Sequence, residues 1–220
     1  MRVLIVGAGG LGREVLATVL AMAAAGTDIA CHGFLVDSQY GSPSNIHGFP
    51  VYRDLVPLHE NPELQVVVAL GNPASRRRAA HRIEAAAGPR FATVLHPALS
   101  IGTNVTIGAG TMTVGPASVT TDVRIGRHVL INPLVSVSHD CCLADFATLG
   151  PSVALAGGVG VDEGAELGVG ACVIPRQTVG AWSMVGAGST VIRPVAPNTT
   201  VVGAPARQIV ARPQGWHTDL

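Results

Sequence analysis

The sequence contains no lysine: all 14 of its basic residues are arginine. Every catalytic scheme that depends on a lysine amine is therefore excluded. Charged residues make up only 13% of the chain, and the formal net charge is zero. Because a nucleic-acid-binding protein needs a basic surplus to neutralise phosphates, this balance argues against nucleic acid as a main partner.

Long apolar runs are also missing. No run reaches the roughly 18 residues that a membrane-spanning helix needs, and the chain opens on a strand pattern rather than on a signal peptide. The four cysteines, Cys31, Cys141, Cys142 and Cys172, form neither a C-x-x-C pair nor the framework of a disulfide-rich secreted protein. We therefore expect a cytoplasmic protein without a membrane span.

The most regular feature of the chain is a repeat of six residues that begins at Leu95. A branched aliphatic side chain returns at every sixth position, with Thr113 as the exception. The positions are Leu95, Ile101, Ile107, Thr113, Val119, Ile125, Ile131, Val137, Leu143, Leu149, Leu155, Val161, Leu167, Val173, Val179, Val185 and Val191. A helix with 3.6 residues per turn drifts away from this period at once. The repeat predicts a parallel β-solenoid of about five coils, each with three short sides; the alternative is a glycine-rich β-sandwich with this spacing by chance.

Two further positions of the repeat support the solenoid. The fourth residue after the aliphatic one is small or β-branched in most repeats, so it is predicted to point inward with the aliphatic side chain. The residue directly after the aliphatic one is often glycine, which we attribute to a tight corner with unusual φ and ψ angles. These glycines are Gly102, Gly108, Gly126, Gly150, Gly168, Gly180 and Gly186.

The N-terminal segment has the pattern of a nucleotide-binding fold. A short apolar strand over residues 2–6 leads into G-x-G-x-x-G, and an alanine-rich helix is predicted over residues 11–25. Such glycines let backbone amides approach a phosphate at a helix N-terminus, although they are also consistent with a tight turn alone. A second strand, GFLVD, ends at Asp37, where this fold presents a carboxylate to a ribose hydroxyl. About 95 residues precede the solenoid, which is room for half of a dinucleotide fold and favours a mononucleotide or a nucleotide-sugar.

A third strand over residues 65–71 leads to another predicted helix, with Asn72 as its cap and Pro73 at its first position. Residues 76–78 are all arginine and lie in the first turn. Basic residues oppose the helix dipole there, which indicates either a nearby anion or a solvated basic face.

The predicted fold is thus an α/β half-Rossmann domain over residues 1–94, a parallel β-helix over residues 95–195, and a C-terminal cap and tail over residues 196–220. Because no linker separates the first two domains, we expect them to pack rigidly. Residues 213–220 are expected to be disordered.

Within the solenoid, the candidate catalytic side chains are those of His139 and Asp140. Val137 and Cys141 occupy the inward positions, so His139 is predicted to point outward. An exposed imidazole can accept a proton near neutral pH, and an adjacent carboxylate fixes its tautomer and raises its basicity. Cys141 is predicted to be a packed thiol and Cys142 a turn residue. Because neighbouring strand residues point in opposite directions, these side chains are not expected to share a metal ion.

Several motifs together resemble a known family. The motifs IVGAGGLGRE, FLVD, ALGNPASRR, SVSHDCCLADFATLGP, LGVGACVIP and VVGAPAR are similar to those of the sugar acyltransferases of the left-handed β-helix superfamily. The resemblance covers about residues 2–210, and it is most specific to the family of sialic acid O-acetyltransferases and bacterial nucleotide-sugar N-acetyltransferases. It implies a left-handed, hexapeptide-repeat β-helix and a homotrimer with active sites between neighbouring solenoids.

The resemblance also implies an activity and its residues. His139 would be the general base that takes a proton from an amine or hydroxyl of the acceptor during direct attack on acetyl-CoA, and Asp140 would orient it. Positions that contact CoA in relatives match Gly168, Val169, Ala187, Gly203, Ala204, Pro205 and Arg207. Positions that hold the nucleotide-sugar match Gly9, Gly10, Asp37, Gly71, Asn72 and Arg76.

The chain departs from the family pattern at two positions. Many N-acetyltransferase relatives have a second histidine nine residues after the base, near the acetyl carbonyl; here that position is Thr148, which we count among the CoA contacts. Many also have histidine in the glycine loop, where this chain has Leu11. These departures favour O-acetylation or a different sugar over the N-acetylation of those relatives, although an amine acceptor stays open. Transfer of a longer acyl group and a non-catalytic trimeric scaffold that binds a nucleotide-sugar also stay open.

Overall fold

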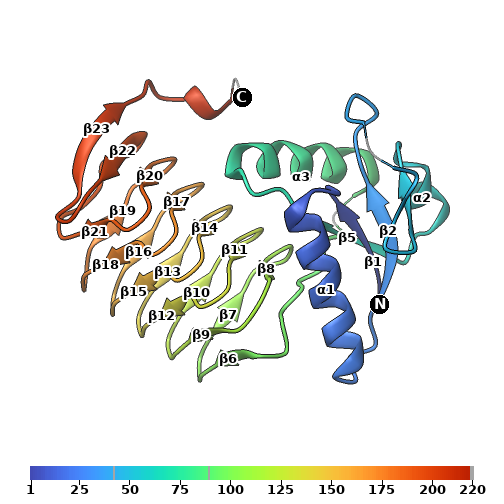
Figure 1. The fold of residues 1–220 in the computed structure, drawn as a ribbon, viewed down its shortest axis with the longest axis horizontal. Coiled ribbons are helices and arrows are strands. Elements are labelled where there is room, and N and C mark those ends of the chain that lie inside the picture. Colours follow the sequence, from blue (N-terminus) through green and yellow to red (C-terminus); the bar gives the residue numbers. More distant parts are fainter. Residues whose placement is uncertain (42, 89, 219–220) are drawn as a thin grey trace.

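The computed structural model describes residues 1–41, 43–88 and 90–218. An N-terminal α/β domain lies beside one end of a long stack of short strands (Figure 1). No helix in these ranges is long and apolar enough to cross a membrane.

The N-terminal domain is a five-stranded sheet, ordered β3-β4-β2-β1-β5. Its strands are β1 (Arg2–Val6), β2 (Ala30–Leu35), β3 (Asn45–Ile46), β4 (Phe49–Tyr52) and β5 (Leu64–Val68). Its helices are α1 (Gly10–Ala24), α2 (Val56–Glu60) and α3 (Pro73–Ala87). β1 pairs in parallel with both β2 and β5, as expected of a half-Rossmann domain. The strands predicted to end at Asp37 and at residue 71 end earlier, at Leu35 and Val68.

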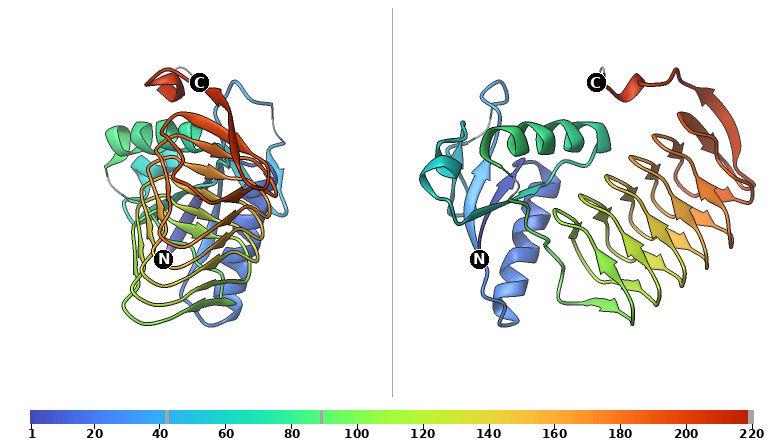
Figure 2. Two further views of the ribbon diagram at one scale, coloured as in Figure 1. Left: turned by 90° about the vertical axis from the view of Figure 1, so that its left-hand side faces the viewer. Right: turned by 180° about the vertical axis from the view of Figure 1, so that it is seen from behind.

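The remaining strands form three sheets that wind around one core (Figure 2), and all of their pairings are parallel except that of the last strand, β23, with β22. Sheet 1 contains β7 (Thr106–Ile107), β10 (Arg124–Ile125), β13 (Cys142–Leu143), β16 (Gly160–Val161) and β19 (Thr178–Val179). Sheet 2 contains β8 (Met112–Thr113), β11 (Leu130–Ile131), β14 (Thr148–Leu149), β17 (Glu166–Leu167), β20 (Met184–Val185), β22 (Thr199–Val202) and β23 (Arg207–Ala211). Sheet 3 contains β6 (Leu99–Ile101), β9 (Ala117–Val119), β12 (Ser136–Val137), β15 (Ala154–Leu155), β18 (Cys172–Val173) and β21 (Thr190–Val191).

The pairing register confirms the predicted three-sided coil. Arg124 pairs with Thr106 on one side and with Cys142 on the other, so neighbouring strands are 18 residues apart, or three repeats of six. We call the corners of the coil the 3/1 edge, the 1/2 edge and the 2/3 edge, after the sheets that they join. Cys142 was predicted to be a turn residue, but it lies in β13 with its side chain exposed.

The core of the β-helix is made of the predicted positions. Val137 is 0% exposed and Cys141 is 1% exposed, which confirms that both point inward. Thr113, the exception in the aliphatic series, is also fully buried, and its hydroxyl accepts a hydrogen bond of 2.7 Å from the backbone N–H of His96. A hydroxyl is therefore tolerated at this position because it ties down the segment that enters the β-helix.

The repeat glycines do not serve the purpose that the sequence suggested. The left-handed backbone conformation occurs at the third residue after the aliphatic position, for example at Asp140 with φ of 60°. The glycines are needed because neighbouring coils stack closely: a Cβ on Gly168 would lie 2.7 Å from the backbone nitrogen of Ala187. A Cβ on Gly150 would likewise lie 2.8 Å from the carbonyl oxygen of Leu167.

The C-terminal region differs from its prediction in two ways. β22 still pairs in parallel with β20, so the β-helix continues to Val202 before β23 closes it. The tail was expected to be disordered, but it turns back toward α3 (Figures 1 and 2) and forms the 3-10 helix η1 (Trp216–Thr218). The ring of His217 stacks on Trp182 with centroids 3.7 Å apart, an aromatic contact that fixes the tail on the 1/2 edge. The part of the prediction that concerns residues 219–220 lies outside the described residues.

The junction between the two domains contains a buried histidine on the 1/2 edge. The ring of His128 is stacked on Phe146 at 5.0 Å and lies edge-on to Phe91 at 4.4 Å. Burial lowers the pKa of His128 to about 4, and the neighbouring charges of Arg127 and Arg76 act in the same direction. The imidazole is therefore neutral in the folded protein at physiological pH.

This histidine is expected to make the protein sensitive to acid. The pKa of His128 is lower in the folded state than the ordinary 6.5, so the unfolded state takes up a proton first as the pH falls. The free energy of unfolding is therefore unaffected by this group above pH 6.5 and decreases as the pH falls from there toward 4. The loss of unfolding free energy should be on the order of 3 kcal/mol. Urea unfolding of the wild type and His128→Asn between pH 4 and pH 7 checks this, since asparagine suits the φ of 55° and does not titrate. An equally steep pH dependence in the variant would assign the effect to other groups.

Candidate active site

His139 and Asp140 form an exposed pair on the 3/1 edge, directly after β12. Nδ1 of His139 donates to Oδ2 of Asp140 at 2.7 Å, and the side chains are 64% and 66% exposed. The left-handed backbone of Asp140 turns the chain at this corner, a conformation that aspartate tolerates better than most residues. Because the carboxylate occupies Nδ1, the other ring nitrogen, Nε2, is the one available to accept a proton.

The imidazole lies directly against the next coil of the β-helix. A Cβ built on Gly157 would be 2.6 Å from Nε2 and 3.1 Å from Nδ1 of His139, so a side chain there would collide with the ring. The sequence analysis missed Gly157. The available signal was its distance of 18 residues from His139, which is one full turn of the β-helix.

A hollow of about 410 Å³ adjoins this pair, lined by Asn104, Thr106, Asp122, Arg124 and Asp140. Nδ2 of Asn104 donates to Oδ1 of Asp122 at 2.6 Å, and this hydrogen bond holds the pKa of the Asp122 carboxyl below its ordinary value. Asp122, Asp140 and the guanidinium of Arg124 all line this hollow, so the surroundings of His139 favour a group that both donates and accepts hydrogen bonds.

Apart from Thr148, the residues expected to contact CoA gather along the 2/3 edge. Val169 is 55% exposed, and Gly168 stacks against Ala187 one coil further on. The turn between β22 and β23 lies at the end of this edge, because the N–H of Gly203 donates to the hydroxyl of Ser189 at 3.0 Å. Ala204 and Pro205 in that turn are exposed and joined by a cis peptide bond, and Arg207 starts β23. The structure thus gathers the predicted CoA positions on one edge and His139 on another.

A second cavity, of about 360 Å³, opens at the carboxyl ends of β1, β2 and β5. This is where open α/β sheets bind ligands. Its lining residues are Val6, Gly7, Leu35, Val36, Asp37, Gln39, Tyr40, Leu70, Ser75, Arg78, Ala79 and Arg82. Nη1 of Arg82 donates to Oδ2 of Asp37 at 2.8 Å, and this contact lowers the pKa of the Asp37 carboxyl. The sequence analysis missed Arg82. Its spacing of four residues from Arg78, one of the three arginines considered for a nearby anion, places both on one face of α3.

The predicted substrate glycines flank this cavity. A Cβ on Gly9, Gly10 or Gly71 would meet no atom within 4 Å, so packing does not require glycine there. Open backbone at these positions leaves the N–H groups accessible to a ligand. Asn72 caps α3 as predicted, since its Oδ1 accepts from the N–H of Ser75 at 2.9 Å.

Two predicted contacts do not face either cavity. Arg76 is 0% exposed and donates to backbone carbonyls of both domains, so the prediction that it contacts substrate is wrong. Thr148 is 5% exposed, and its hydroxyl accepts from Nη2 of Arg76 at 2.7 Å. It is therefore enclosed at the domain junction and does not border the CoA edge. Both residues are covered because α3 lies against the 1/2 edge, where Arg127 also donates to Glu84 near the other end of the helix. Local sequence patterns do not reveal this arrangement.

Comparison with solved structures identifies the family. A variant of the perosamine N-acetyltransferase from Caulobacter crescentus, solved in complex with CoA and GDP-perosamine, matches with a TM-score of 0.84. The two sequences are 31% identical, and the match covers 96% of this chain and 97% of that chain. The chain belongs to the hexapeptide-repeat family of nucleotide-sugar N-acetyltransferases. The family and the fold predicted from the sequence are thereby confirmed.

Other relatives agree with this nucleotide-sugar N-acetyltransferase assignment. Residues 2–83 match the family model of the PglD N-terminal domain. The acetyltransferase domain of PglB from Neisseria gonorrhoeae FA1090, solved with acetyl coenzyme A, matches with a TM-score of 0.84 and 27% identity over 94% of this chain and 98% of that chain. A putative acetyltransferase of Schizosaccharomyces pombe is 30% identical over 87 residues, which are 40% of this chain and 42% of that protein. The chain thus spans less than half the length of the curated relatives that it matches.

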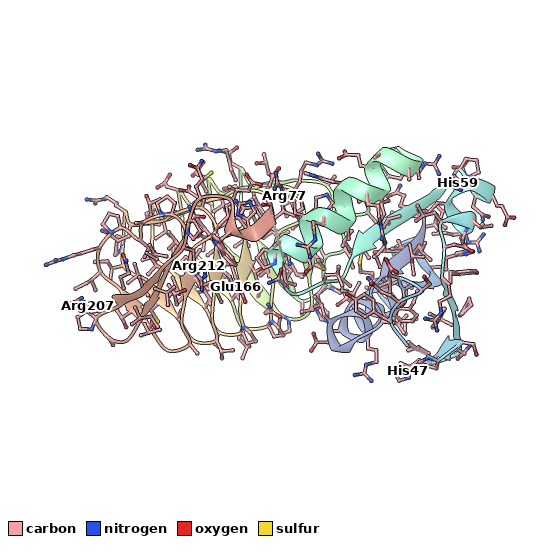
Figure 3. All side chains as sticks on the ribbon, turned by 90° about the horizontal axis from the view of Figure 1, so that it is seen from above. His47, His59, Arg77, Glu166, Arg207 and Arg212 are labelled. Carbon is pink, nitrogen blue, oxygen red and sulfur yellow. The ribbon has the colours of Figure 1, made fainter. Side chains whose placement is uncertain are left out.

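Within residues 1–41, 43–88 and 90–218, no group of three histidine, cysteine or acidic side chains could hold a metal ion. His47 and His59 lie in the N-terminal domain at the end of the molecule away from the β-helix, whereas Arg207 lies near the opposite end (Figure 3).

Proposed function

We propose that this protein transfers the acetyl group of acetyl-CoA to an amine of a nucleotide-linked sugar. The observation that carries the proposal is the His139–Asp140 pair, exposed on a β-helix whose relatives were solved with CoA and GDP-perosamine or with acetyl coenzyme A. The nucleotide would bind in the cavity of the N-terminal domain, which Asp37 lines. Gly9, Gly10, Gly71 and Asn72, close in sequence to the lining residues Gly7, Leu70 and Ser75, would contribute from its rim. A cytoplasmic location stays a prediction from the cysteine pattern.

The chemistry follows from the geometry of the pair. The acceptor amine attacks the thioester carbonyl carbon while Nε2 of His139 takes a proton from the amine nitrogen. Asp140, hydrogen-bonded to Nδ1 at 2.7 Å, holds the tautomer and stabilises the imidazolium. The C–S bond then breaks, and the proton passes from the imidazolium to the departing CoA thiolate. An amine is favoured over a hydroxyl because the perosamine enzyme, 31% identical to this chain, is an N-acetyltransferase.

A single chain does not bring the base and the CoA residues together. His139 lies on the 3/1 edge, whereas Val169, Ala187 and the turn at Gly203 lie on the 2/3 edge. If three copies form a ring around a threefold axis parallel to their β-helices, the 3/1 edge of one copy would face the 2/3 edge of the next. This separation supports a homotrimer with the active site between subunits.

The activity is tested by release of the CoA thiol from acetyl-CoA with a panel of GDP-, UDP- and dTDP-linked amino sugars and free sialic acid. Release with one acceptor, and a product mass that shows an acetylated amine, is the expected result. A hydroxyl-acetylated product would correct the acceptor class. If the protein is a trimer but releases no thiol and binds no acetyl-CoA, the proposed enzyme activity would be wrong and a non-catalytic scaffold would be favoured.

Mixing two inactive variants tests the shared site. Trimers co-expressed from His139→Ala and Ala187→Glu chains should recover about one quarter of wild-type activity, because a random arrangement pairs an intact base with an intact CoA edge at about one interface in four. Each variant alone should be inactive. If mixed trimers are also inactive while each variant is folded and trimeric, the base and the CoA edge of the same chain must act together.

A further inference from the structure

Arg76 differs from its neighbours Arg77 and Arg78 because its whole side chain is buried. It leaves the first turn of α3 and points toward the β-helix, where it is 0% exposed. On its own domain, Nη1 donates to the carbonyl oxygens of Leu70 and Gly71 at 2.7 and 2.8 Å. These two residues connect β5 to the cap of α3.

The other guanidinium nitrogens bind the β-helix. Nε donates to the carbonyl oxygen of His128 at 2.9 Å, and Nη2 donates to that of Phe146 at 2.7 Å. Nη2 also donates to the carbonyl of Ala147 at 3.3 Å and to the hydroxyl of Thr148 at 2.7 Å. Within the described residues, Thr148 is the only side chain to which Arg76 donates a hydrogen bond. One planar group thus joins the strand-to-helix segment of the first domain to the 1/2 edge and sheet 2 of the second.

The charge of Arg76 has no carboxylate in direct contact within the described ranges. Glu166, next to Thr148 in sheet 2, supplies an attractive charge at longer range (Figure 3). The five donors of a guanidinium in a fixed fork suit such a ring of carbonyl oxygens, whereas an ammonium would reach fewer of them. The arrangement therefore depends on arginine specifically.

The joined segment is also the wall of the nucleotide cavity. Leu70 and Ser75 line that cavity, and the predicted substrate residues Gly71 and Asn72 lie between them. We propose that Arg76 is a positioning residue for the nucleotide-sugar: with Thr148, it fixes segment 70–72 against the β-helix and so sets where the acceptor sits. This role rests on the proposed function, and it assigns Thr148 to substrate placement through Arg76.

The test compares matched variants by calorimetry. Free GDP, UDP and dTDP are titrated to find the nucleotide that the wild type binds, and acetyl-CoA is titrated in parallel. Thr148→Val, which removes the hydroxyl at constant shape, should weaken nucleotide binding about three- to tenfold, and Arg76→Met more than tenfold. Acetyl-CoA binding should change less than twofold. Thr148→Ser and the surface variant Arg77→Met, whose partner is Glu163 at 3.3 Å, should bind both ligands like the wild type.

Hydrogen exchange supplies an independent readout. The backbone amides of segment 70–72 should exchange faster in Thr148→Val than in Thr148→Ser, while those of the β-helix core stay protected. Equal losses of nucleotide and acetyl-CoA binding, or unchanged nucleotide binding in both Arg76→Met and Thr148→Val, would overturn the positioning role of Arg76. The proposed function would not be affected by either result. A wild type that binds acetyl-CoA but none of the nucleotides would overturn the proposed substrate cavity, and this role with it.

Discussion

Replacing His139 by asparagine is expected to lower kcat by a factor on the order of 10²–10⁴, with KM for both substrates within about twofold of the wild type. Asparagine cannot accept a proton from the acceptor, but it keeps a polar side chain of similar size at a position that is 64% exposed. Neither folding nor binding should therefore suffer. The measurement is steady-state release of the CoA thiol with the acceptor found for the wild type.

The same substitution at His47 is a matched control. His47 is exposed in the N-terminal domain, away from the β-helix (Figure 3), and its φ of 49° suits asparagine. His47→Asn should keep full activity. If His139→Asn keeps more than about one tenth of the wild-type kcat, a different group must take the proton.

Replacing Gly157 by alanine is expected to lower kcat by a factor of about 10², although glycine itself has no side chain that could take part in the reaction. Gly157 is not among the positive-φ residues, so its backbone accepts alanine. Its Cβ, however, would lie 2.6 Å from Nε2 of His139 and would push the ring off the neighbouring coil. A shift of about 1 Å in a catalytic group is enough for a loss of this size.

Gly160→Ala provides the comparison, because its Cβ would make ordinary contacts of 3.6 and 3.7 Å with Thr178. We expect near-normal kcat for that variant and a melting temperature close to the wild type for both. Near-normal turnover in Gly157→Ala would mean that the ring of His139 can act from another position. A large drop in melting temperature of Gly157→Ala would assign the effect to stacking of the coils.

The architecture was predictable because it depends on one period. Inward side chains repeat every six residues over some hundred positions, and only a three-sided coil keeps all of them buried together. His139 was found for the same reason, since Val137 and Cys141 fix which way it points. The purpose of the repeat glycines was not predictable, because the distance between stacked coils is not a local property of the chain.

The three adjacent arginines show where sequence reasoning ends. On a helix each residue is rotated by about 100° from the last, so Arg76, Arg77 and Arg78 face different surroundings. Arg76 is buried at the domain junction, Arg77 reaches Glu163, and Arg78 lines the nucleotide cavity. Which of them faces a ligand depends on how α3 docks on the 1/2 edge of the β-helix, and that is a tertiary contact. The same contact encloses Thr148, which was counted among the CoA contacts only because relatives have a histidine at this position.

The 18-residue coil also limits how this chain can change in length. Inserting one whole coil between His139 and Gly168 would move the base and the CoA edge further apart along the axis while leaving each on its own edge. Inserting six residues would instead rotate everything after the insertion by about 120°, which would carry Val169 and Ala187 onto the edge where His139 now lies. Length variants of such an enzyme therefore fall into two classes. Insertions of whole coils change the distance between the base and the CoA residues along the axis, whereas insertions of six residues move the CoA residues to a different edge.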